Sequence, residues 1–200
     1  MSSFSQSVAY NLRSLTRFSG RDTRAQFWPY AFTLFCIVSS AGSLWMQFEM
    51  RSLIGAARPS FGSGRHAHVA NIPGGVAGLM EAIILGFAVG IGLYVLLMAS
   101  AVARRLHDTD RTGAWGLLPV GFLTIGFAGF WRISTDLVGG FRPGGLFPLI
   151  FANNIVYFCS LVALVVMLVR DGTGGPNEFG PDPRPEVPVT EAEEAVPDSG

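Results

Sequence analysis

Four long stretches of the chain contain no charged residue, and they dominate its hydropathy pattern. They cover residues 25–48, 82–103, 112–131 and 147–169. A charge-free apolar run of about 18 residues or more reads as a membrane-spanning helix, because about 20 residues at a rise of roughly 1.5 Å cross the hydrocarbon core. Lipid offers no partner to free backbone groups, so each span must be helical. The pattern predicts an all-α, polytopic integral membrane protein with about four transmembrane helices.

The alternative is a set of buried helices in a soluble protein, but soluble helices of this length carry a polar stripe and these runs do not. The run at 112–131 is the least regular, because it contains several glycines and Pro119. Pro119 has no N–H to donate to the carbonyl of Trp115, which predicts a kinked full span. A re-entrant hairpin is the other interpretation of this run.

The segment before the first run has the pattern of an amphipathic helix. Phe4, Val8, Leu12, Leu15 and Phe18 recur at spacings of four and three residues, so they share one helical face. A basic helix of this kind lies in the interface plane of a membrane. The alternative is a short helix packed on the rest of the protein. We predict an N-terminal amphipathic interfacial helix.

These patterns divide the chain into ten segments. In order they are a cytoplasmic N-terminal segment (1–24), a first span (25–48), an outer loop (49–81), a second span (82–103), a cytoplasmic loop (104–111), a third span (112–131), an outer loop (132–146), a fourth span (147–169), a cytoplasmic Gly/Pro-rich motif (170–183) and a disordered acidic tail (184–200). The tail is assigned from its prolines, its acids and its low apolar content.

The placement of arginines predicts how the spans are oriented. Four spans put both termini on one side, and that side carries nine of the fourteen arginines, against five on the other. Positively charged residues are retained in the cytoplasm, so both termini are predicted to be cytoplasmic.

Composition excludes several classes of protein. Charged residues make up 14% of the chain, below the roughly 25% of a typical soluble domain, and the formal net charge is zero. A nucleic-acid partner is not expected, because there is no basic excess. A hydrophobic content of 50% excludes a disordered protein. Two cysteines, Cys36 and Cys159, are too few for a disulfide scaffold.

Three polar segments fall on the predicted cytoplasmic side. They are FSGRDTRAQFW at 18–28, RRLHDTDRTGAW at 104–115 and GTGGPNEFGPDP at 172–183. In this order they resemble the bacterial inner-membrane family catalogued as domain of unknown function 805, over most of residues 4–183. The resemblance implies a small multi-pass protein of the bacterial inner (plasma) membrane and supplies no activity. Members of that family often have three spans, and this chain departs from them by carrying a fourth.

The charged side chains of these segments suggest one polar cluster at the cytoplasmic interface. The candidate residues are Arg21, Arg24, Arg104, Arg105, His107, Asp108, Arg111 and Asp182. Arg104 and Asp108 are four residues apart, so they share a helical face if the second span continues that far. Arginine binds phosphate bidentately through its planar fork. Asp182 is expected to return and pair with one of the arginines.

Three interpretations of this cluster stay open. It is a salt-bridge network that fixes helix ends, a site for an anionic ligand or lipid headgroup, or the active site of a headgroup-modifying enzyme that uses His107. No nucleophile or second carboxylate pair accompanies His107 and Asp108, which argues against catalysis.

The leading hypothesis is a non-enzymatic scaffold or binding module that contacts anionic lipid headgroups or a partner protein. A small transporter or channel subunit that works as an oligomer is the alternative. It is disfavoured because no ionisable residue lies at the predicted midplane of any span.

Small residues recur every four positions along the second span, at Gly78, Ala82, Gly86 and Gly90. Such a ridge lets another helix approach closely. The partner helix belongs either to the same chain or to a second copy in a homo-oligomer.

His66 and His68 in the first outer loop are two potential metal ligands, but a zinc site needs three or four, and no further His or Cys is near. We therefore expect no metal and no cofactor. The expected partners are membrane lipids, with a homo-oligomer or a membrane-protein partner as the alternatives.

Overall fold

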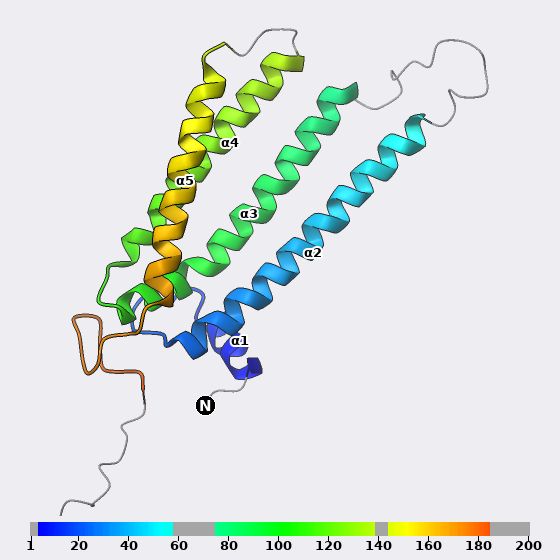
Figure 1. The fold of residues 1–200 in the computed structure, drawn as a ribbon. Coiled ribbons are helices and arrows are strands. Elements are labelled where there is room, and N and C mark those ends of the chain that lie inside the picture. Colours follow the sequence, from blue (N-terminus) through cyan, green and yellow to red (C-terminus); the bar gives the residue numbers. More distant parts are fainter. Residues whose placement is uncertain (1–3, 58–74, 139–143, 185–200) are drawn as a thin grey trace, which may run out of the picture.

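The computed structural model describes residues 4–57, 75–138 and 144–184, and within these ranges the regular structure is helical. The elements are α1 (Phe4–Arg13), α2 (Arg24–Ala57), α3 (Gly75–Asp108), the 3₁₀ turn η3 (Gly113–Gly116), α4 (Leu117–Val138) and α5 (Leu146–Val169). Figure 1 shows the four long helices side by side, with α1 at the lower end near the start of α2. Four helices are long and apolar enough to cross a membrane. The predicted class, an all-α multi-pass membrane protein, is confirmed.

The helices α2 and α3 extend beyond the charge-free runs that predicted them. α2 continues to Ala57, and α3 runs to Asp108, through part of the segment predicted as a cytoplasmic loop at 104–111. A charged residue ends an apolar surface but not a helix, because Arg and Glu are good helix formers. The predicted loops at 49–81 and 104–111 are therefore partly helical.

α4 has no kink in its middle at Pro119. The turn η3 comes first, and α4 begins at Leu117, so Pro119 lies in its first turn. The N–H groups of a first turn have no helical partner, so a proline there removes no hydrogen bond. α4 continues as one helix to Val138, and the ion pair Arg132–Asp136 (3.4 Å) lies in its last turns. This excludes the re-entrant hairpin.

The start of α2 is fixed by one half of a capping box, in which the side chain of Gln26 returns to the residue before the helix. The carbonyl of Thr23 accepts the backbone N–H groups of Gln26 and Phe27 at 3.1 and 3.0 Å. In return the Thr23 N–H donates to Oε1 of Gln26 at 2.9 Å. A side chain that returns in this way satisfies an otherwise unpaired donor at a helix start. These bonds also fix the two residues just before the box, Arg21 and Asp22, which belong to the site described below.

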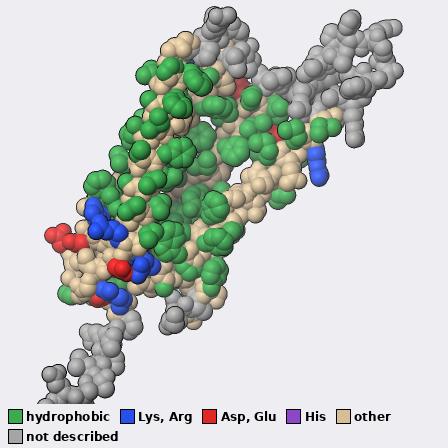
Figure 2. Space-filling view, in the orientation of Figure 1, with side chains coloured by type: hydrophobic (Ala, Val, Ile, Leu, Met, Phe, Trp, Pro, Cys, Tyr) green, Lys and Arg blue, Asp and Glu red, His purple; other side chains and the backbone are tan. Residues whose placement is uncertain are grey.

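Buried side chains concentrate at one end of the bundle. α2 packs along α3, and α4 packs along α5. The buried apolar cluster consists of Phe27, Tyr30, Ala31, Leu34, Met98, Ala101, Leu106, Leu164 and Leu168. Most other large apolar side chains of the described helices are exposed, and Figure 2 shows them covering the long helices above a lower end where charged groups gather. Apolar side chains distributed in this way face lipid.

Glycines allow α4 and α5 to approach closely. A Cβ atom at Gly129 would lie 2.7 Å from Cγ1 of Ile150, and one at Gly126 would lie 3.3 Å from Nδ2 of Asn153. Asn153 also donates to the backbone carbonyl of Phe122 at 3.0 Å. An amide of α5 therefore bonds directly to the backbone of α4.

We expect Gly129→Ala to destabilise the protein, because Ile150 is β-branched and has no easy alternative rotamer. Overpacking of this kind costs about 1–3 kcal/mol. Gly121→Ala in the same helix is the control, since nothing lies within 4 Å of a Cβ there. Thermal unfolding in a mild detergent measures both variants. Equal Tm values would contradict the close packing of α4 on α5.

Candidate functional site

Four parts of the chain meet at the lower end of the bundle (Figure 1). They are α1, residues 14–23, the end of α3, and residues 170–184 that follow α5. We call this assembly the polar platform, because nearly all the buried charged groups of the described chain lie in it. Its contacts join residues of the three polar motifs of the sequence.

The end of α3 is closed by a Schellman motif. The N–H of Arg111 donates to the carbonyl of Leu106 at 3.0 Å, and the N–H of Asp110 donates to that of His107 at 3.1 Å. Asp110 adopts a φ of 58°, the left-handed conformation that this cap requires. The motif keeps Asp108 in the last helical turn, where its carboxylate faces the other segments.

Arg104 fastens the N-terminal region to α3. Its Nε donates to Oδ2 of Asp22 at 2.8 Å, and its Nη2 donates to Oδ1 of Asn11 at 2.7 Å. Its Nη1 donates to the carbonyls of Ser14 and Arg17. The backbone N–H of Asp22 returns a bond to the Arg104 carbonyl at 3.2 Å. Both Arg104 and Asp22 are 0% exposed.

Arg105 fastens α3 to the end of α5. Its Nε donates to the carbonyl of Leu168 at 2.9 Å, and its Nη2 donates to the carbonyl of Arg170. Its Nη1 forms an ion pair with Asp108, three residues further along the helix. Arg105 is also 0% exposed. It therefore bonds only within the protein and bridges two helices.

Arg21 joins the first motif to the second and the third. Its Nε and Nη2 donate to Oδ1 of Asp108 at 3.1 and 3.0 Å. Its Nη1 donates to the carbonyl of Gly175 at 2.7 Å, and its Nη2 donates to that of Thr173 at 2.6 Å. The Thr173 N–H donates to the Asp108 carbonyl at 2.8 Å. Asp108 is thus shared by two guanidinium groups, and residues 173–180 fold around Arg21.

The buried charges depend on one another. Burial raises the pKa of the Asp22 carboxyl, while the guanidinium of Arg104 acts in the opposite direction and lowers it. The Tyr10 hydroxyl donates to Oδ1 of Asp22 at 3.1 Å and also favours the charged form. Removing one partner of a buried ion pair leaves an uncompensated charge, which is strongly destabilising. The network therefore holds the platform together as a unit.

His107 lies between the first and third motifs. Its ring stacks on Phe179, with centroids 4.1 Å apart and planes at 6°. Its Nδ1 lies 3.2 Å from the carbonyl of Gly20. Asn177 donates to the backbone carbonyl of His107 at 2.9 Å. The ring is thus a packing surface inside the platform.

Arg24 and Arg111 lie outside the buried network. Arg24 forms an ion pair with Asp171, but the two side chains are 49% and 80% exposed. The side chain of Arg111 forms no hydrogen bond or ion pair with the part of the chain that the structure describes.

The expectation that Asp182 pairs with an arginine of the first two motifs is wrong. Its carboxylate bonds instead to Arg184, with Oδ1 2.8 Å from Nε and Oδ2 2.7 Å from Nη2. These bonds hold the pKa of Asp182 well below its usual range. Asp182 pairs with Arg184, only two residues away, because closing a short loop costs little chain entropy. Asp182 reaches Arg21 only indirectly, by accepting the N–H of Gly175 at 2.9 Å.

The sequence did not single out the polar face with which α1 docks. Ser7 and Asn11 are 1% exposed, and both side chains donate to the carbonyl of Gln26 in α2. The signal was present as polar residues at positions 7, 11 and 14, which recur at helical spacing. Phe4 and Leu12, on the apolar face that predicted the helix, are 57% and 48% exposed.

Part of the small-residue ridge of α3 lies against α2 of the same chain. A Cβ at Gly86 would lie 2.7 Å from Cδ1 of Trp45, and one at Gly90 would lie 4.0 Å from Cγ1 of Val38. Gly78 and Ala82 continue this ridge toward the start of α3.

Two sequence features fall outside the described residues, namely the His66/His68 pair and the tail from 185 to 200. Within the described ranges no group of three or more His, Cys, Asp or Glu is placed to hold a metal ion.

The fold and the platform define a class, namely a four-helix membrane protein with three polar motifs joined at one end. A family model described as "Protein of unknown function (DUF805)" matches residues 15–181. The chain belongs to this family, which confirms the resemblance of its motifs. No curated protein and no solved structure matches the chain.

Proposed function

We propose that the protein is a non-enzymatic scaffold or binding module of the bacterial inner membrane, and that the polar platform is its working part. The observation that carries this proposal is the internal pairing of the buried charges. The donors of Arg21, Arg104 and Arg105 bond to protein acceptors. A buried network of this kind holds three distant segments as one surface, and it leaves these guanidinium groups unavailable to a substrate.

The proposed orientation places the platform and both termini in the cytoplasm. It rests on the excess of arginines at this end of the spans, nine against five. The arginines at 13 and 17 belong to this count and are exposed to solvent.

The role of His107 supports a non-enzymatic function. A general base needs a ring nitrogen within reach of a substrate proton. Here the ring is stacked on Phe179, and Nδ1 faces the Gly20 carbonyl. These contacts favour a structural use of the imidazole.

A photo-crosslinking amino acid at Glu178 tests the proposal in living bacteria. Glu178 is an exposed position of the platform, and Arg51 is an exposed position near the other end of α2. We expect a discrete covalent adduct from position 178 that position 51 does not give, because only the platform is a working surface. No adduct from position 178, or the same adducts from both positions, would overturn the proposal.

A further inference from the structure

α1 presents three chemically different faces. Ser7 and Asn11 dock on α2, as described above. Val8 packs against the buried apolar cluster. On the same side as Val8, Phe4 and Leu12 are exposed. The third face is polar and includes the exposed Arg13.

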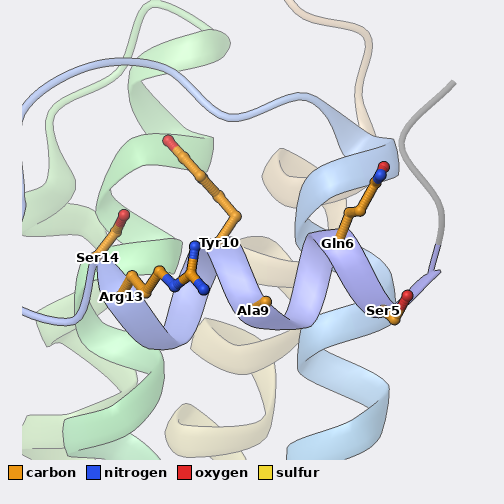
Figure 3. Close-up of a pocket in the computed structure, with 6 residues that line it drawn as sticks. All are labelled: Ser5, Gln6, Ala9, Tyr10, Arg13 and Ser14. Atoms are coloured by element: carbon orange, nitrogen blue, oxygen red, sulfur yellow. The ribbon is translucent and has the colours of Figure 1, made fainter.

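This outer face carries an open depression of about 540 Å³ (Figure 3). The residues that line it are Ser5, Gln6, Ala9, Tyr10, Arg13 and Ser14. Figure 3 shows the Arg13 side chain beside that of Tyr10. The exposed Arg13 therefore brings a guanidinium group to this depression, and guanidinium groups bind phosphate.

Arg13 and Arg17 differ from the arginines of the buried network. Both are exposed, and within the described ranges neither side chain forms an ion pair or a hydrogen bond. Arg17 follows Arg13 by four residues, and its Nη2 would lie 3.7 Å from a Cβ atom at Gly20. The two guanidinium groups are therefore available to an anion from outside the chain.

The position of α1 along the bundle indicates the source of that anion. α1 bonds to the carbonyl of Gln26, in the first turn of α2. Two residues further on, Trp28 is 38% exposed, and exposed tryptophans mark the level of the membrane interface. Phe4 and Leu12 would then lie at the boundary of the acyl chains, and Arg13 and Arg17 at the level of the phosphates.

We infer that α1 and the residues that follow it to Arg17 form a binding site for anionic phospholipid, with Arg13 and Arg17 on the headgroup phosphate and with Phe4 and Leu12 against the acyl chains. This inference rests on the proposed function for the cytoplasmic position of the platform, and it deepens that function by naming a ligand class. The inference assigns headgroup recognition to the exposed α1, and not to the buried Arg104 and Arg105.

Native mass spectrometry of the full chain in mild detergent, titrated with phosphatidylglycerol, tests the site. We expect Arg13→Gln with Arg17→Gln to weaken phosphatidylglycerol binding about 25-fold, since each cation near an anionic surface contributes about fivefold. Arg51→Gln is the matched control, because it removes an exposed arginine at the other end of α2, and it should change nothing. Lysines at 13 and 17 should retain most of the binding, because they keep the charge.

Two further arms separate a lipid from a free phosphate. Phosphatidylcholine should bind wild type weakly and should not respond to the Arg13/Arg17 variant. Phe4→Ser with Leu12→Ser should weaken phosphatidylglycerol binding and leave the binding of glycerol 3-phosphate unchanged.

Three results would overturn the inference. They are equal phosphatidylglycerol affinity of wild type and the double Gln variant, an equal loss in Arg51→Gln, and equal affinity of wild type for phosphatidylcholine. Because the side chains at 13 and 17 make no bonds within the described chain, an unchanged Tm should accompany the loss of binding. The crosslink from Glu178 does not depend on these arginines, so the scaffold proposal and the lipid site can fail separately.

Discussion

Arg104→Ala is expected to lower the free energy of unfolding by about 3–5 kcal/mol. The variant leaves the carboxylate of Asp22 buried without its cation. It also removes the guanidinium group that donates a hydrogen bond to Oδ1 of Asn11. The carbonyls of Ser14 and Arg17 lose their bonds as well. Denaturation in mild detergent, followed by circular dichroism, measures the loss.

Arg24→Ala is the matched control for this prediction. It also breaks an Arg–Asp ion pair, but Arg24 and Asp171 are exposed to solvent. Exposed pairs contribute about 0–1 kcal/mol, so the loss should be small. Equal losses in the two variants would show that the Arg104 pair is not buried in the folded protein.

A double variant separates pairing from packing at this site. Arg104→Met with Asp22→Asn removes both charges and keeps much of the volume. It should recover part of the stability lost in Arg104→Ala, because no unpaired charge stays buried. A double variant no more stable than Arg104→Ala would show that the unpaired Asp22 carboxylate is not what destabilises Arg104→Ala, since both variants lack the hydrogen bonds to Asn11, Ser14 and Arg17.

The long helices could be predicted from the sequence because a segment that crosses lipid must be apolar and helical along its whole length. The run at 147–169 corresponds to α5, Leu146–Val169, almost residue for residue. The ends of α2 and α3 could not be predicted from the apolar runs. Once a helix leaves the apolar layer, water accepts charged side chains on it, and only capping contacts decide where it stops. For α3 that contact is the cap at Asp110.

Only part of the candidate site was predictable from the sequence, since Asp22, the buried partner of Arg104, was not among the candidate residues. The motifs placed Arg21, Arg105 and Asp108 at one end of the bundle, and ion pairs join them there. Many of the acceptors are backbone carbonyls, such as that of Leu168, which every residue carries and which no residue type reveals.

The docking of α1 illustrates how tertiary context overrides a local pattern. Its apolar residues predicted the helix, and Val8 does pack on the buried cluster. However, the buried guanidinium of Arg104 needs acceptors, and Asn11 provides one. A buried charge without such partners would be costly, so the polar face of α1 turns inward.

Gly172→Ala is the second substitution for which we expect a loss of about 3–5 kcal/mol, through the same mechanism of broken buried ion pairs. A Cβ at this position would lie 2.5 Å from Cγ of Asp108 and 2.7 Å from its Oδ1. The carboxylate cannot swing aside, because Arg21 bonds to Oδ1 and Arg105 bonds to Oδ2. Adding one methyl group must therefore either expel residues 173–184 or separate Asp108 from its arginines.

Gly174→Ala provides the control two residues away, where the nearest atom to a new Cβ, Nη2 of Arg184, is at an ordinary contact distance of 3.8 Å. We expect limited proteolysis to cut after residue 172 much faster in Gly172→Ala than in Gly174→Ala or wild type. The helical circular dichroism should persist in all three, because the apolar surfaces of α2 to α5 are untouched. Unchanged proteolysis and Tm in Gly172→Ala would mean that the Asp108 carboxylate is free to move, and the description of the platform as a mutually locked network would then be wrong.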